Sequence, residues 1–213
     1  MKITLVYDND VYTKGLKADW GFSCLVEVED IPKILFDTGG SGAILLYNME
    51  KLNIDPASIG EVAISHSHWD HAGGLSDFLK ENKEVKLYLP NSFCRHFEAK
   101  EVICVKEALQ IHENVFTTGE LLGIEQSLVV KTDKGLVVIA GCSHPGVGNI
   151  LEAASQFGKV YALVGGLHGF SEFDLLEDLE LVCACHCTMY KSKIKSLYPD
   201  KWVEGGAGKV ISI

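Results

Sequence analysis

Residues 66–71 read His-Ser-His-Trp-Asp-His, which places three imidazoles and a carboxylate within six positions. Such residues make a poor core segment, but imidazole and carboxylate groups are good ligands for zinc, iron or manganese. A strand-like apolar run precedes them, and an extended chain turns alternate side chains to one face, so His66 and His68 can hold one ion together. A turn into the following helix then directs Asp70 and His71 toward a second position. Surface histidines are the weaker interpretation, because a polar loop has no reason to produce this spacing.

Length and composition suggest one ordinary globular unit. The chain has 213 residues, of which 47% are hydrophobic and 23% are charged, a typical balance for a protein with a real core. No linker, internal repeat or low-complexity segment divides it, so we expect a single domain over residues 1–213. The net charge of -10 argues against non-specific binding to the phosphate backbone of nucleic acids.

The chain shows no sign of export or membrane insertion. The apolar stretch that begins at Met1 is too short for a signal peptide, and Asp8 interrupts it. No run approaches the roughly 20 apolar residues needed to span a bilayer. We therefore expect a soluble cytoplasmic protein that does not act at a membrane. Seven cysteines are an odd number, which favours free thiols or metal contacts over a disulfide framework.

Short strands alternate with helices along the chain, which favours an α/β fold. The expected strands are 3–7, 22–28, 33–36, 61–65, 86–89, 127–132, 136–140, 160–164, 181–184 and a short one near Val210. Helices are expected after Ser41, after the histidine cluster, after Pro90, around Ile150 and near the C-terminus. Asp133-Lys134-Gly135 predicts a tight hairpin between two of the strands.

Three further strand ends carry a histidine, namely His144, His168 and His186. Glycines beside these positions allow the backbone to approach a site closely. Polar residues on loops at the ends of strands are where active sites usually lie. His96 and His112 have no such setting, so we interpret them as structural or surface residues.

With these pieces in order, the chain resembles the metallo-β-lactamase superfamily. The string from His66 to His71 matches its His-x-His-x-Asp-His signature, Asp37-Thr38-Gly39 matches its early Asp loop, and His144 and His186 match its later ligands. A narrower likeness joins the chain to a branch labelled dihydropterin-ribofuranosylaminobenzene phosphate synthase. It rests on Gly21-Phe22-Ser23, Phe36 to Gly39, Ser65 to His71, Gly141 to Gly146, Gly165 to His168 and His186-Cys187-Thr188.

The resemblance implies a four-layer αβ/βα sandwich of two mixed sheets flanked by helices, with two divalent metal ions in a groove at one edge. Zinc is the expected metal, with iron or manganese as alternatives. His66, His68 and His144 would hold the first ion, and Asp70, His71 and His186 the second. Asp37 would lie behind these ligands and fix the histidine loop by hydrogen bonds, as metal sites commonly require.

Two departures from the pattern concern the site. Much of the superfamily has a metal-bridging Asp in a Gly-Asp pair, where this chain reads Gly141-Cys142. Either a water molecule occupies an open bridge, with Cys142 beside the ligands, or Cys142 approaches the bridge as a thiolate, and we favour water. Met189 stands where the branch usually has Gly, which predicts a changed pocket wall. The alternating Cys183, Cys185 and Cys187 are expected to be mostly small core thiols.

Motif and resemblance together predict a metal-dependent hydrolase, in which a metal-bound hydroxide attacks an ester, lactone, amide or phosphodiester. Asp70 would orient the nucleophile. His168 would stabilise developing charge or the leaving group, although it could instead bind a substrate anion, replace a metal ligand or serve as a structural histidine. The substrate would be a small molecule, which the branch suggests is phosphorylated or pterin-like.

Three other functions stay open. The branch label suggests a synthase that joins a pterin to an aminobenzene ribotide. A non-catalytic sensor that binds a metal or ligand is possible on the same scaffold. A diiron oxygen-reducing enzyme ranks lowest, because it would have Glu where His68 stands. The sequence carries no assembly signal, so the oligomeric state is left open.

Overall fold

The computed structural model describes residues 1–213, and its strands form two sheets. The first sheet, in the order β13-β1-β2-β3-β4-β5-β6, contains β1 (Lys2–Tyr7), β2 (Ser23–Glu27), β3 (Lys33–Phe36), β4 (Ile59–Ala63), β5 (Lys86–Pro90), β6 (Glu101–Val105) and β13 (Val210–Ser212). The second, in the order β12-β11-β10-β9-β8-β7, contains β7 (Leu109–His112), β8 (Val115–Thr117), β9 (Leu128–Thr132), β10 (Gly135–Ala140), β11 (Val160–Gly166) and β12 (Leu181–Cys185). Both sheets mix parallel and antiparallel pairs.

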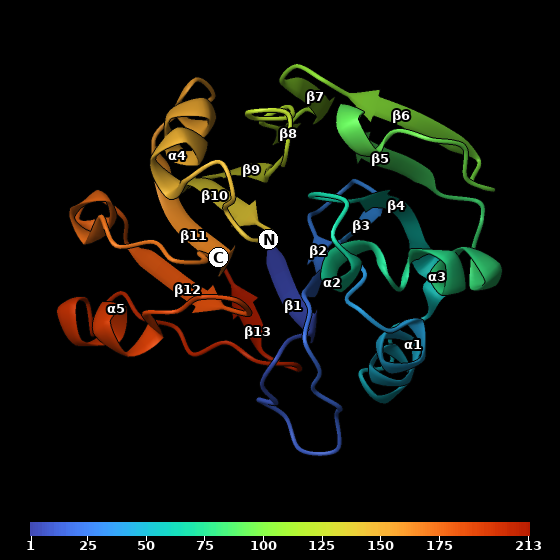
Figure 1. Cartoon of the computed structure of the whole chain (residues 1–213), viewed down its shortest axis with the longest axis horizontal. Helices are drawn as coiled ribbons and strands as arrows, with labels where there is room; N and C mark the ends of the chain where they lie inside the picture. The colour runs from blue at the N-terminus through green and yellow to red at the C-terminus, as the bar shows by residue number, and fades with distance from the viewer.

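Helices flank the two sheets on their outer sides (Figure 1). Beside the first sheet lie α1 (Gly42–Lys51), α2 (Trp69–Ala72) and α3 (Leu75–Glu81), and beside the second lie α4 (Val147–Ser155) and α5 (Lys191–Leu197). Short 3-10 turns cover Pro56–Ser58, Asn91–Phe93 and Phe173–Leu176. The expected sandwich of two mixed sheets flanked by helices is confirmed.

Alternation along the strands produces these layers. In β2, Cys24 and Val26 belong to the cluster between the sheets, whereas Leu25 packs with the residues of the helical layer. In β10, Val137 and Ile139 face the first sheet, and their neighbours face α4 and α5. Because both faces of these strands are covered, they read as nearly continuous apolar runs.

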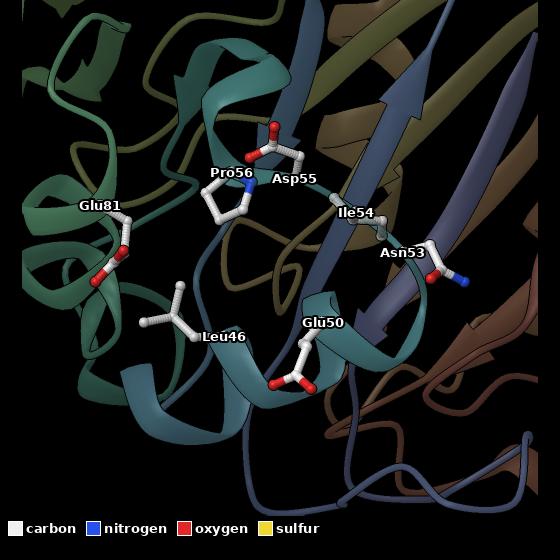
Figure 2. Close-up of a pocket in the computed structure, with 7 residues that line it drawn as sticks. All are labelled: Leu46, Glu50, Asn53, Ile54, Asp55, Pro56 and Glu81. Atoms are coloured by element: carbon white, nitrogen blue, oxygen red, sulfur yellow. The ribbon is translucent and has the colours of Figure 1, made fainter.

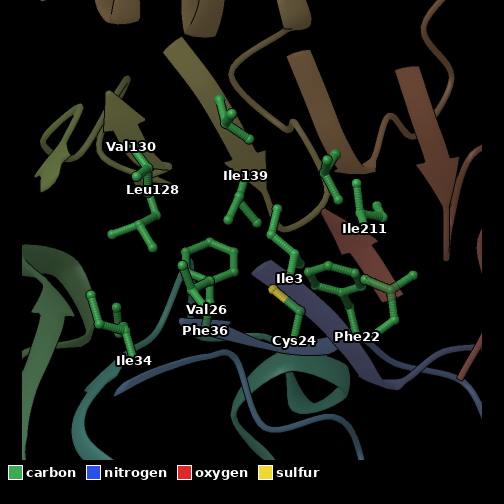
Figure 3. Packing of buried hydrophobic residues seen from close by; sticks show 14 of the residues in the cluster. Ile3, Phe22, Cys24, Val26, Ile34, Phe36, Leu128, Val130, Ile139 and Ile211 are labelled. Carbon is green, nitrogen blue, oxygen red and sulfur yellow. The ribbon is translucent and has the colours of Figure 1, made fainter. Parts of the chain in front are cut away.

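The largest core lies between the two sheets. Figure 3 shows Ile3, Phe22 and Phe36 of the first sheet and its loops facing Leu128 and Ile139 of the second. This cluster contains 20 buried residues from both halves of the chain. Each fully buried aliphatic or aromatic side chain contributes about 1.5–3 kcal/mol relative to exposure, so the shared core holds the two sheets against each other.

Most expected strands form within a residue or two of their predicted limits, but the segment after Pro90 differs. The expected helix is reduced to the turn Asn91–Phe93, and the strands β6, β7 and β8 were not predicted. β6 and β7 are the edge strands of their sheets and are largely half-buried or exposed, so they lack the apolar pattern that marks a strand. The preference for free thiols was wrong for Cys94 and Cys104, which form a disulfide with a Cα–Cα distance of 5.4 Å. None of the helices is long and apolar enough to cross a bilayer.

The shared core leads to a prediction about unfolding. We expect the metal-free chain to lose both sheets in one cooperative transition, with coincident midpoints from far-ultraviolet circular dichroism and tryptophan fluorescence. Ile139→Ala, which truncates a buried side chain of the shared cluster, should lower the free energy of unfolding by about 2–5 kcal/mol. Two separated transitions would show that the two halves fold independently and are not one domain.

Candidate metal centre

The side chains singled out by the sequence lie after the carboxyl ends of strands. Asp37 follows β3, His66 follows β4 after two residues, His144 follows β10, His168 follows β11 and His186 follows β12. β3 and β4 run parallel, and so do β10, β11 and β12. Parallel strands place their carboxyl ends on the same edge of a sheet, where ligands commonly bind. The shared core brings the two edges together.

A first group of ring nitrogens comes from His66, His68 and His144. The Nε2 atom of His66 lies 3.0 Å from Nδ1 of His68. The ring of His144 lies 4.8 Å, between centroids, from the ring of His66 and at the same distance from that of His68. The buried Nε2 atom of His144 has no hydrogen-bond partner. A buried polar nitrogen without a partner is rare in proteins and indicates a missing ligand.

A second group comes from Asp70, His71 and His186. The Nε2 atoms of the two histidines are 3.2 Å apart. One carboxylate oxygen of Asp70, Oδ2, lies 3.3 Å from Nε2 of His186 and 3.7 Å from Nε2 of His71. Histidines separated by 115 positions in the sequence therefore point their rings at the same carboxylate.

Asp37 fixes one histidine of each group. Its carboxylate accepts hydrogen bonds from the backbone N–H and the hydroxyl of Ser65, both at 2.7 Å, and from Nδ1 of His71 at 2.7 Å. The Ser65 hydroxyl then accepts from Nδ1 of His66 at 2.9 Å. Since Nδ1 is the donor in both rings, the Nε2 atoms of His66 and His71 carry lone pairs that face the site.

Asn9 holds the third ring in the same way. Its Oδ1 atom accepts from Nδ1 of His186 at 2.9 Å and from the backbone N–H of Gly21 at 3.0 Å. Its amide nitrogen donates to the carbonyl of His186 at 3.3 Å, which fixes the orientation of the amide. The Nε2 atom of His186 is therefore also unprotonated.

Burial keeps these rings neutral. Desolvation lowers the pKa of His66 and of His144, and lowers that of His71 well below its ordinary value. Burial works against ionisation of Asp70, but its proximity to His186 and His71 holds the pKa of that carboxyl low. The lone pairs of His66, His71 and His186 thus converge with a carboxylate at one site. This donor set fits divalent cations, which bind deprotonated ligands.

The loops that carry the site are strained. Asp37, Ser143, His168 and His186 have φ angles of 59°, 61°, 46° and 49°, in the left-handed region that costs a residue with a side chain about 1–3 kcal/mol. Such strain persists only where surrounding contacts enforce it.

Glu125 holds the conformation of the loop between β10 and α4. This residue was not predicted from the sequence. Its buried carboxylate accepts the backbone N–H groups of Gly141, Cys142, Ser143 and His144 at 2.9 to 3.1 Å. Burial raises the pKa of Glu125 to about 7, and the donors from Cys142, Ser143 and His144 oppose that rise. A carboxylate in an irregular segment between two strands gives no sequence signal, because its partners are defined only by the fold.

Two thiols lie within the same site. The Sγ atom of Cys142 is 3.1 Å from Nε2 of His71 and 3.2 Å from Sγ of Cys187. The hydrogen bond between the two thiols raises the pKa of Cys142, as does burial, and it lowers the pKa of Cys187 to about 6. Cys142 was expected to lie beside the ligands. The structure places its sulfur atom among them.

A pocket of about 350 Å³ opens over these groups. It is lined by Trp20, His68, Trp69, Asp70, Cys142, His144, His168 and Cys187. The two tryptophans are 50% and 62% exposed, and the indole N–H of Trp20 donates to Oδ2 of Asp70 at 3.0 Å. The ring of His168 lies 5.0 Å from that of His144 and also borders a second hollow of about 290 Å³. Asp70 and His168, expected to be catalytic, thus both line the pocket.

A larger hollow, of about 580 Å³, lies elsewhere on the surface beside α1 and α3 (Figure 2). Its lining includes Glu50, Asp55 and Glu81 but no histidine or cysteine. Volume alone therefore does not locate the chemistry of this protein.

The structure brings together the six expected metal ligands and places Asp37 directly behind two of them. It also adds Asn9, Trp20, Glu125 and Cys187. Asn9 was the most accessible of these from sequence, because it follows β1 at the same kind of strand end. His96 is exposed, and His112 pairs with Glu61 at 2.9 Å outside the pocket.

The chain is similar to known proteins over nearly its whole length. A 7,8-dihydropterin-6-methyl-4-(beta-D-ribofuranosyl)-aminobenzene-5'-phosphate synthase of Methanocaldococcus jannaschii is 28% identical, over 98% of this chain and 95% of the relative. The structure of Tm1679, described as a metal-dependent hydrolase of the beta-lactamase superfamily, is 26% identical with a TM-score of 0.80, covering 100% of this chain and 99% of that one. YhfI from Bacillus subtilis shares the fold, with a TM-score of 0.71 at 12% identity over 99% of this chain and 98% of that one.

The family model described as the metallo-beta-lactamase superfamily matches residues 21–141. This range is more than half of the chain and includes Asp37, the complete histidine string and Glu125. The chain belongs to the metallo-beta-lactamase superfamily.

Proposed function

We propose that this chain is a hydrolase that holds two divalent metal ions and cleaves an ester, lactone or phosphodiester bond in a small molecule. The observation that carries the proposal is the presence of two adjacent groups of candidate ligand atoms under one pocket. Its similarity to a solved chain described as a metal-dependent hydrolase supports the same conclusion.

The two groups divide the ligands between the ions. His66, His68 and His144 would hold one ion, and Asp70, His71 and His186 the other. This set of imidazoles and a carboxylate suits zinc, with iron or manganese as alternatives. Bound divalent ions supply Lewis acidity and lower the pKa of a coordinated water from 15.7 to about 7.

The side chains of the pocket would orient the reaction. Trp20 holds Oδ2 of Asp70 through its indole N–H, so the carboxylate keeps one direction when a substrate enters. The ring of His168 is exposed beside His144, where one of its nitrogens can give a proton to a leaving group. The exposed faces of Trp20 and Trp69 can hold the flat part of a substrate.

A synthase acting on a pterin is the second candidate. Its support is the near full-length similarity to the archaeal dihydropterin-ribofuranosylaminobenzene phosphate synthase. The two tryptophans at the pocket suit a flat heteroaromatic ring as well as they suit an acyl or lactone substrate. The two groups of candidate metal ligands suit either reaction, so analysis of the products must distinguish hydrolysis from condensation.

The metal assignment predicts a specific stoichiometry. Protein purified without added metal should contain two ions per chain, and His186→Ala should reduce this to about one, because the second group loses a ligand that no neighbour replaces. Plasma mass spectrometry measures both values. His96→Ala, which alters an exposed histidine outside the pocket, should keep two ions. Unchanged metal content in His186→Ala would remove His186 from the second group.

A second prediction concerns Asp37. Asp37→Asn preserves size but replaces an acceptor oxygen with a donor, so the bonds to Ser65 and His71 cannot all form. Zinc affinity, measured by competition with a chromophoric chelator, should fall by about 10- to 100-fold. Asp77→Asn, at a half-buried position of α3 where the side chain pairs with Lys80 away from the site, is the matched control and should bind zinc normally. Equal affinity in both variants would contradict the role of Asp37.

A third prediction tests the reaction itself. We expect zinc-loaded protein to hydrolyse at least one member of a panel of phosphodiesters, lactones and thioesters, and Asp70→Asn to lower kcat/KM by about 10²- to 10⁴-fold. The same protein should be incubated with a dihydropterin diphosphate and a ribofuranosylaminobenzene phosphate, with products separated by mass spectrometry. A condensed product without any hydrolysis of the panel would favour the synthase.

A further inference from the structure

The sulfur atom of Cys142 lies between the two groups of candidate ligands. Together with Asp70, His71 and His186 it forms one set in which all ligand atoms lie within 4.8 Å of one another. It forms a second such set with His66 and His144. The only other side chain common to ligand sets on both sides is Asp70, and its Oδ2 atom already accepts the indole N–H of Trp20.

The distance from this sulfur to His71 is close to that between two ligands of one metal ion. Zinc binds imidazole nitrogen at about 2.0–2.1 Å and thiolate sulfur at about 2.3 Å, so two such ligands on one tetrahedral ion lie about 3.5 Å apart. The Sγ atom of Cys142 is 3.1 Å from Nε2 of His71. In the metal-free chain the thiol can donate its proton to that nitrogen, and metal binding releases such a proton to solvent.

The loop leaves this sulfur little freedom to point elsewhere. Glu125 accepts the backbone N–H of Cys142 and of the residues on both sides of it. Gly141, just before it, has no room for a side chain, because a Cβ atom there would collide with the hydroxyl of Ser65. Cys142 is only 3% exposed. A buried sulfur held this firmly beside lone pairs is positioned as a ligand.

We propose that Cys142 is a thiolate ligand shared by both metal ions, so that the centre has seven protein ligands instead of six. Each ion would then have four protein ligands, and the water of the proposed reaction would be a fifth ligand. This inference rests on the proposed dinuclear centre and adds a bridging sulfur to it. A soft thiolate favours zinc or iron over manganese and magnesium.

Cys187 provides the matched control. Its sulfur lies 3.2 Å from that of Cys142 and lines the same pocket, but it belongs to neither set of clustered ligand atoms. Cys187→Ser and Cys142→Ser therefore remove chemically identical atoms from adjacent places. The full-length chain with two zinc ions per molecule is the starting material for both variants.

X-ray absorption at the zinc edge tests the inference directly. A shared thiolate predicts an average of one sulfur per zinc at about 2.3 Å, which is lost in Cys142→Ser and kept in Cys187→Ser. Cobalt-loaded protein should show a thiolate-to-metal charge-transfer band with the same pattern. The affinity for the second zinc ion should fall by at least about 10-fold in Cys142→Ser. Loss of a residue that only supports a metal ligand already costs about that much, and loss of a direct ligand should cost no less.

Other outcomes overturn the inference in distinguishable ways. Two zinc ions with only nitrogen and oxygen ligands would exclude a sulfur bridge and leave the dinuclear centre intact. One sulfur per two zinc ions would make Cys142 a ligand of a single ion, and loss of sulfur only in Cys187→Ser would assign the wrong thiol. Wild-type protein that binds no zinc would refute the proposed function as well. Because the wild-type spectrum alone counts the sulfur atoms, a failure of Cys142→Ser to fold would not prevent the test.

Discussion

The carboxylate of Asp37 is fully buried and accepts hydrogen bonds from Ser65 and from the ring of His71. Through the Ser65 hydroxyl it also orients His66, so one side chain fixes a histidine of each ligand group. Burial raises its pKa well above the ordinary value, and the donors from Ser65 oppose that rise. The cost of burying this carboxylate is offset only if all its donors stay in place. This requirement ties the end of β3, the end of β4 and the start of α2 into one rigid unit.

A second buried carboxylate plays the corresponding part on the other sheet. Glu125 gathers four consecutive N–H groups of the loop after β10 and thereby sets the positions of Cys142 and His144. The two carboxylates approach the same ring from behind the site, since Glu125 comes within 4.0 Å of Nδ1 of His66, which Asp37 orients through Ser65. The positive φ angles of Asp37 and Ser143 are held by these contacts, and that of His186 by its hydrogen bonds with Asn9. Strain at the site is balanced by hydrogen bonds immediately behind it.

Membership in the metallo-beta-lactamase superfamily fixes the scaffold and leaves the reaction to the pocket. The scaffold supplies strand ends that converge on one edge. What distinguishes this chain lies in the details at that edge, where the indole of Trp20 holds Asp70, the ring of Trp69 is exposed, and a thiol occupies the centre of the ligand set. Hydrolysis and pterin condensation would draw on the same ligands and differ in what the two tryptophans receive.

Sequence alone determined the α/β architecture and the local metal motif, because both depend on short-range periodicity. Strands covered on two faces read as apolar runs, and the spacing from His66 to His71 is set by a strand that turns into α2. Relating distant residues such as His144 and His186 to that motif required the resemblance to a family. The edge strands β6 and β7 and the turn after Pro90 were not predictable, since exposed edges carry little apolar signal. Only the tertiary structure showed that Asn9 and Glu125 support the site through hydrogen bonds, and where the Cys142 sulfur lies. Each of these depends on contacts between segments that only folding brings together.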